Sequence, residues 1–188
     1  MSTALVPLAQ GCEELEAVTI IDLLRRAGIT VVTAGLEKGP VTASRGVVLL
    51  PETTLDIVMD RNFDLLVLPG GISGTQQLEA DWRILELLRR QNEQGRYIAA
   101  ICAAPRVLAS AGLLNYRKAT AYPGILEGIT NANGIRLIKN AAVVRDGTLI
   151  TSRGPGTAIE FTLVLIELLA GRNTRDEVEA ALQGRFIN

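Results

Sequence analysis

The chain alternates short apolar runs with longer helical segments, and this alternation most constrains how it can fold. Four runs have the length of buried strands, at residues 3–9, 29–34, 65–68 and 97–101. Segments with the apolar spacing of helices cover residues 14–27, 80–92, 103–111 and 156–169, and a short polar helix covers residues 175–182. Strands that alternate with helices predict an α/β fold, a mainly parallel sheet with helices on both faces.

Two other segments read as paired strands. Residues 41–50 predict two short strands around Ser44-Arg45-Gly46, and residues 141–152 predict a hairpin that turns at Asp146-Gly147. The chain has 188 residues and shows no linker, repeat or low-complexity segment, so we expect one domain over residues 1–188. Ligands of such sheets bind beyond the carboxyl ends of the strands, which here are residues 11–16, 69–74 and 102–105.

The sequence contains no histidine. Ser-His-Asp and Cys-His catalysis are therefore closed to this chain, as are histidine-ligated metal sites. Its two cysteines, Cys12 and Cys102, are too few to close a structural zinc site, so we expect no metal. A general base must be a carboxylate, a lysine, a tyrosine or a thiolate.

Charge and hydropathy indicate which partners and cellular locations to expect for the protein. The net charge of -1 offers no excess positive field for nucleic acid or an anionic membrane surface. No apolar run reaches the ~18 residues that cross a bilayer, and the first ten residues lack the pattern of a signal peptide. We expect a soluble cytoplasmic protein with free thiols.

Cys102 is the strongest candidate for chemistry. The strand at residues 97–101 runs directly into a helix, with Cys102 at the junction, small residues around it and Pro105 in the first helical turn. This pattern resembles a nucleophile elbow with cysteine in place of serine. A helix N-terminus would stabilise the thiolate and lower the thiol pKa below its usual ~8.5. The alternative is a small buried hydrophobe, and the local sequence does not separate the two.

Other segments near the strand ends have both a structural and a functional interpretation. The N–H groups of Gly71 and Ala103 would suit an oxyanion hole, although Pro-Gly-Gly is most often a turn. Three glutamates, Glu13, Glu14 and Glu16, open the first helix, where acids ordinarily complement the helix dipole. Residues 152–157 are best explained as a turn and a helix cap.

Six segments together are similar to one known family. They are residues 11–16 (GCEELE), 25–29 (RRAGI), 44–46 (SRG), 67–71 (VLPGG), 99–105 (AAICAAP) and 151–157 (TSRGPGT). In this order, along nearly the whole chain, they resemble the DJ-one/ThiJ/PfpI superfamily, and specifically its parkinsonism-associated and bacterial YajL-like branch.

The resemblance implies a flavodoxin-like three-layer sandwich that forms a homodimer without a cofactor. It implies that Cys102 is an oxidation-prone nucleophile and that Glu16 is its protonated carboxyl partner. Gly71 and Ala103 would supply backbone donors. Arg26 and Arg45 match family arginines near the site and the dimer interface, where they would bind an anion or the second subunit.

The chain departs from the family at Tyr122, because many relatives place a histidine there, close to the cysteine. Tyr122 would act as a hydrogen-bond donor or an aromatic wall and not as a base near pH 7. The Cys-His protease and amidotransferase chemistries of the wider superfamily are excluded, so we expect no protease.

The activities that the resemblance implies are glyoxalase, repair of methylglyoxal- or glyoxal-modified proteins and nucleotides (deglycase), redox-regulated chaperoning and peroxide response. We favour an enzyme, a hydrolase or lyase acting on small reactive carbonyls through Cys102 and Glu16. The alternative is a non-enzymatic redox sensor or chaperone that depends on oxidation of the same cysteine. One accessible thiol serves both functions, so the sequence leaves them open.

Overall fold

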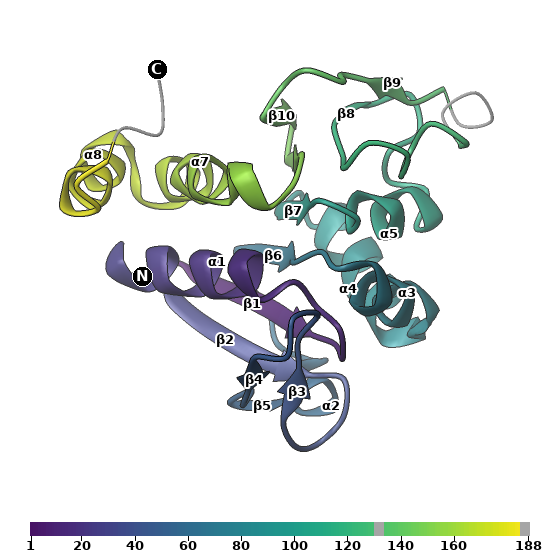
Figure 1. Cartoon of the computed structure of the whole chain (residues 1–188), viewed down its shortest axis with the longest axis horizontal. Helices are drawn as coiled ribbons and strands as arrows, with labels where there is room; N and C mark the ends of the chain where they lie inside the picture. The colour runs from purple at the N-terminus through teal and green to yellow at the C-terminus, as the bar shows by residue number, and fades with distance from the viewer. Residues whose placement is uncertain (130–133, 185–188) are drawn as a thin grey trace.

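A seven-stranded sheet forms the centre of the molecule in the computed structural model, which describes residues 1–129 and 134–184 (Figure 1). The strand order is β10-β11-β7-β6-β1-β2-β5. These strands are β1 Thr3–Leu8, β2 Thr30–Gly35, β5 Thr53–Thr54, β6 Leu65–Leu68, β7 Tyr97–Ile101, β10 Val143–Asp146 and β11 Leu149–Ser152. All neighbouring strands are parallel except β10 and β11, the antiparallel hairpin predicted at residues 141–152. The mainly parallel sheet is thus confirmed.

Helices cover both faces of this sheet. They are α1 Glu14–Arg26, α2 Leu55–Val58, α3 Ile72–Ala80, α4 Trp82–Glu93, α5 Pro105–Ser110, α7 Ala158–Ala170 and α8 Arg172–Ala181, with a 3₁₀ turn η1 at Pro155–Thr157. Helices α1 and α7 pack against each other on one face, whereas α3, α4 and α5 lie together on the other (Figure 1). This is the α/β sandwich that the sequence predicts.

The alternation of side chains along each strand creates the two cores. In β6, Leu65 and Val67 belong to the core beneath α1 and α7. Leu66 and Leu68 belong to the core beneath α4 and α5. Successive side chains of a strand point to opposite faces, so a strand buried on both sides reads as a continuous apolar run.

The largest difference from the predicted elements lies between β6 and β7. Residues 72–80 form α3, where the sequence predicts a loop because of the glycines at the start of the helix. The next helix, α4, begins at Trp82 and not at residue 80, because the Asp81 side chain caps it by accepting the N–H of Arg83. The predicted strand pair at residues 41–50 is confirmed as β3 Val41–Thr42 and β4 Val48–Leu49. A parallel pair, β8 Lys118–Ala119 and β9 Arg136–Leu137, has no counterpart in the predicted elements.

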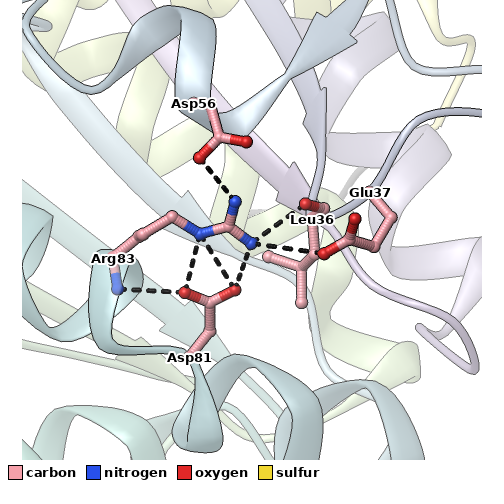
Figure 2. Close-up of polar contacts among 5 residues, drawn as sticks. All are labelled: Leu36, Glu37, Asp56, Asp81 and Arg83. Carbon is pink, nitrogen blue, oxygen red and sulfur yellow. Dashed lines mark hydrogen bonds and ion pairs between the residues drawn. The ribbon is translucent and has the colours of Figure 1, made fainter.

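The side chain of Arg83 connects three elements at the β5 edge of the sheet through a group of hydrogen bonds (Figure 2). The Arg83 guanidinium, in the first turn of α4, donates to both carboxylate oxygens of Asp81, at 2.9 and 2.6 Å. It also donates to the Asp56 carboxylate of α2 at 2.7 Å and to the Leu36 carbonyl, just after β2, at 3.0 Å. One mostly buried side chain therefore fixes α4 and α2 against the end of β2.

No helix in the described part of the chain is long and apolar enough to span a lipid bilayer.

Candidate active site

Cys102 occupies a strained turn between β7 and α5. Its φ angle is +63°, in the left-handed region that non-glycine residues rarely adopt. Its N–H donates to the Ser152 carbonyl of β11 at 3.0 Å, and its carbonyl accepts the Tyr122 N–H at 2.8 Å. Hydrogen bonds on both sides hold this conformation. The geometry is that of the sharp strand-to-helix turn that the local sequence resembles.

Glu16 lies beside Cys102 although the two residues are far apart in the sequence. Its side chain is fully buried in the first turn of α1, and its Oε2 accepts the N–H of Gly70 at 2.8 Å. The carboxyl interacts with the Cys102 thiol closely enough for each group to alter the pKa of the other. The second oxygen, Oε1, has no partner in regular hydrogen-bond geometry among the described residues.

Burial raises the pKa of both members of this pair. It raises the pKa of Glu16 to about 7, against the hydrogen bonds from Gly70 and the thiol. Burial, followed by the negative charge of Glu16, raises the pKa of the Cys102 thiol to about 12. The predicted lowering of the thiol pKa is therefore wrong when Glu16 is ionised. The two groups share one proton over a wide pH range and titrate as a unit.

Backbone N–H groups of Gly71 and Ala103 both interact with the Cys102 sulfur and oppose this rise in its pKa. They are the two donors named from the sequence. Gly71 has a φ angle of +91°, and a Cβ there would lie 2.4 Å from the Gly11 carbonyl oxygen. Only glycine can therefore bring its N–H to this position.

A pocket of about 520 Å³ opens onto Cys102. Its lining combines apolar side chains, including Ile72 and Ile125, with the polar Glu13 and Ser44. The volume falls in the range of small-molecule sites. Among the described residues, no group of three or more Cys, Asp or Glu side chains is arranged to hold a metal ion.

The family model described as the DJ-1/PfpI family matches residues 2–168. This chain belongs to the DJ-1/PfpI family. Protein dj-1beta of Drosophila melanogaster is 46% identical over 181 residues, 96% of each chain. The crystal structure of Drosophila melanogaster DJ-1beta has a TM-score of 0.95 at 45% identity and covers 99% of this chain and 100% of its own. Sequence and fold therefore both confirm the resemblance.

Two further relatives of this DJ-1/PfpI protein carry informative names. The "Glutathione-independent glyoxalase DJR-1.2" of Caenorhabditis elegans is 36% identical over 162 residues, 86% of this chain and 85% of the relative. A structure of Toxoplasma gondii DJ-1, described as oxidized, has a TM-score of 0.91 at 37% identity and covers 97% of this chain and 98% of its own.

Of the three remaining residues that the resemblance assigns to the site, two lie at the Cys102 pocket and one does not. Arg45 and Tyr122 line the Cys102 pocket, and the half-exposed Tyr122 ring lies against Gly154, where an added Cβ would be 3.3 Å from it. Arg26 does not line the pocket. It pairs with Asp22 at 2.7 Å in the last turn of α1, about 15 Å along the helix from Glu16. Of these two arginines, only Arg45 therefore lies at the Cys102 pocket within one chain.

Glu14 has a structural role that the sequence did not reveal. Its carboxylate accepts the Ser44 hydroxyl at 2.9 Å and the Arg45 N–H at 2.8 Å. These bonds hold the turn between β3 and β4 that brings Arg45 to the DJ-1/PfpI pocket. No local pattern indicated them, because the partners are about thirty residues apart.

Cys12 differs from Cys102 in its surroundings. It is almost fully buried and does not line the pocket, and burial raises the pKa of its thiol to about 11. Cys12 is therefore packed as a small buried hydrophobic residue.

Proposed function

We propose that this protein is a glyoxalase- or deglycase-type enzyme that uses Cys102 to attack small reactive carbonyls such as methylglyoxal. The observation that carries the proposal is the buried Glu16 carboxyl beside a pocket-lining thiol and two backbone donors. The relative named a glutathione-independent glyoxalase supports the same reaction class.

The pair supplies the nucleophile by moving one proton internally. When Glu16 holds the shared proton, Cys102 is a thiolate and the pocket contains no second negative charge from the pair. The thiolate sulfur forms a bond to the aldehyde carbon, and the carbonyl electron pair moves onto oxygen. That oxyanion lies next to the sulfur, where the Gly71 and Ala103 N–H groups stabilise it.

Glu16 completes the reaction as a proton carrier. It protonates the oxyanion to give a hemithioacetal and then removes the proton from the former aldehyde carbon, while the neighbouring ketone oxygen takes up a proton, which gives an enediol. It returns a proton to the former ketone carbon as the hydroxyl on the sulfur-bound carbon loses its proton and becomes the thioester carbonyl. The product is a lactyl thioester on Cys102. Water hydrolyses this thioester to lactate and regenerates the thiol, so methylglyoxal and water give lactate without an external oxidant or glutathione. A carbinolamine adduct would first release its amine, which regenerates the free aldehyde, and the thiolate would then attack that aldehyde in the same way.

Lactate formation from methylglyoxal without glutathione tests this proposal. We expect turnover by the wild type and none by Cys102→Ser, with Cys12→Ser as the matched thiol control that retains activity. Full turnover by Cys102→Ser would overturn the mechanism.

A redox-sensing or chaperone function of the same cysteine is the second candidate. The thiol that lines the pocket and the oxidized Toxoplasma gondii relative favour it. A protonated Glu16 would donate a hydrogen bond to a Cys102 sulfinate and make that state persist. Peroxide treatment followed by peptide mass spectrometry, with a parallel aggregation-suppression assay, would show whether oxidation of Cys102 alters partner binding.

Reduced free thiols fit a cytoplasmic location, which we also propose.

We further propose that the protein is a homodimer through α1 and the β3–β4 hairpin. Leu15 and Val18 of α1 are 51% and 46% exposed, and Val48 and Leu50 are 61% and 78% exposed. Val18 and Leu50 line the same groove of about 280 Å³, so exposed apolar side chains of α1 and of the segment after β4 lie close together there. We expect a dimer mass in sedimentation equilibrium, and Val18→Lys should shift it towards the monomer. A wild-type monomer at all concentrations would contradict the dimer.

A further inference from the structure

Three hydrogen bonds connect Glu13, Glu16 and Gly70 in a closed ring. The Glu13 carboxylate accepts the N–H of Glu16 at 2.8 Å and so caps α1. The Glu13 N–H donates to the Gly70 carbonyl at 2.9 Å. The Gly70 N–H in turn donates to Glu16 Oε2 at 2.8 Å, which closes the ring.

This ring fixes the Glu16 carboxyl at both ends. The capping bond holds the Glu16 backbone, and the Gly70 N–H holds its side chain. The third bond ties the start of α1 to the loop after β6, so the two anchors cannot move independently. Because Gly70 also lies against Cys102 Cβ, any displacement of the ring changes the position of the carboxyl relative to the thiol.

Glu13 also contributes charge at this place. It lines the Cys102 pocket, and among the described residues it forms no ion pair with an arginine or lysine. Its negative charge adds to burial in raising the pKa of Glu16. Burial of Glu16 and the negative charge of Glu13 therefore both favour the protonated form of Glu16.

We propose that Glu13 is a positioning residue for the Cys102–Glu16 pair, which holds the Glu16 carboxyl in place and favours its protonated form. The inference deepens the proposed function, because it rests on Glu16 as the proton carrier. An ordinary helix cap would account for the bond to the Glu16 N–H alone. It would not require that the charge of Glu13 alter the titration of Glu16.

Three substitutions separate these roles. Glu13→Asp keeps the charge and a capping oxygen, Glu13→Gln keeps the capping oxygen only, and Glu13→Ala keeps neither. Asp22→Asn removes one carboxylate from an exposed position of the same helix and serves as the charge control. The pKa of Glu16 is read by carbon-13 NMR of the glutamate carboxyls in a Cys102→Ser background. Methylglyoxal kinetics and melting temperatures are measured with Cys102 present.

We expect the pKa of Glu16 to fall by about one pH unit in Glu13→Gln and to stay unchanged in Asp22→Asn. Glu13→Ala should lower kcat between about tenfold and a hundredfold at nearly constant KM, since a small displacement of a catalytic group has effects of this size. Glu13→Asp should recover most of the activity.

An unchanged Glu16 pKa in Glu13→Gln would overturn the proposal, even if Glu13→Ala were unstable or inactive, since a cap alone predicts that outcome. If the wild type does not turn over methylglyoxal, the proposed function fails. The NMR titration still decides whether Glu13 controls the protonation of Glu16.

Discussion

Glu16 and Cys102 meet across the space left by the missing side chain of Gly70. A Cβ at Gly70 would lie 2.6 Å from Glu16 Oε2 and 2.7 Å from Cys102 Cβ, and real Cβ contacts are not this short. The Gly70 N–H also holds the same Glu16 oxygen at 2.8 Å. One glycine therefore both permits and fixes the contact between the carboxyl and the thiol.

Gly70→Ala should separate Glu16 from Cys102. We expect loss of carbonyl turnover and a lower free energy of unfolding, by about 1–3 kcal/mol, since the added methyl group overpacks a buried site. Urea unfolding and methylglyoxal kinetics measure the two effects. Gly128→Ala is the control, because a Cβ there has no neighbour within 4 Å. Wild-type turnover in Gly70→Ala would show that the contact is not needed.

Glu16→Gln should lower the thiol pKa of Cys102 from about 12, because it removes the negative charge that raises it. Turnover should fall by about a hundredfold or more, as expected when a proton carrier is lost. Thiolate absorbance against pH, with Cys102→Ser as the blank, measures the first effect. Glu16→Asp shortens the reach to the sulfur and should yield less Cys102 sulfinic acid under mild peroxide. A Glu16→Gln variant with full turnover would reduce Glu16 to a helix-dipole residue.

The raised pKa of Glu16 makes folding depend on pH in a defined direction. Its pKa is about 7 in the folded protein and 4.5 as a free group, so the folded state binds more protons between these values. Stability should therefore decrease as the pH rises from about 4.5 to 7, by on the order of 3 kcal/mol from this group. Glu16→Gln should lack this component. Denaturant unfolding of both proteins at several pH values gives the comparison, and parallel curves would contradict it.

Cys102 should be alkylated faster than Cys12. Both thiols have raised pKa values, but Cys102 lines the pocket whereas Cys12 is 1% exposed. Limiting iodoacetamide followed by peptide mass spectrometry should find the label on Cys102. Preferential labelling of Cys12 would overturn its assignment as the inert thiol.

Arg83→Ala should destabilise the β5 edge of the sheet by about 2 kcal/mol, because it leaves the mostly buried Asp81 carboxylate without its charged partner. Asp56→Asn should cost less than about 0.5 kcal/mol, since Asp56 is exposed. Although burial opposes it, hydrogen bonding to Arg83 holds the pKa of Asp81 below its ordinary value. This stabilisation is therefore present at neutral pH and lost as the pH falls below the aspartate range. Unfolding curves that change equally with pH in wild type and Arg83→Ala would contradict it.

The sequence alone was enough for most of the fold and for the sharp turn at Cys102. Strands such as β6 and β7 are encoded by their own apolar residues, and the elbow at Cys102 by small residues and Pro105 within a few positions. Such signals are local, because burial on both faces and the start of a helix each depend on neighbouring residues. Helix α3 was missed, since Gly71 and Gly74 resemble a loop until their close contacts with residues 11–13 are known.

Only the tertiary structure decided the electrostatics of the site. The resemblance named Glu16, Gly71 and Ala103 as partners of Cys102, and the structure places them beside it, but the direction predicted from the sequence for the thiol pKa is wrong. Desolvation and the charge of Glu16 outweigh the backbone donors, and both depend on how segments from different parts of the chain pack together. The same long-range packing determines the different partners of Glu13 and Glu14. It also determines the distance of Arg26 from the pocket. Local sequence indicated most of the helices, whereas long-range packing determines what their side chains reach.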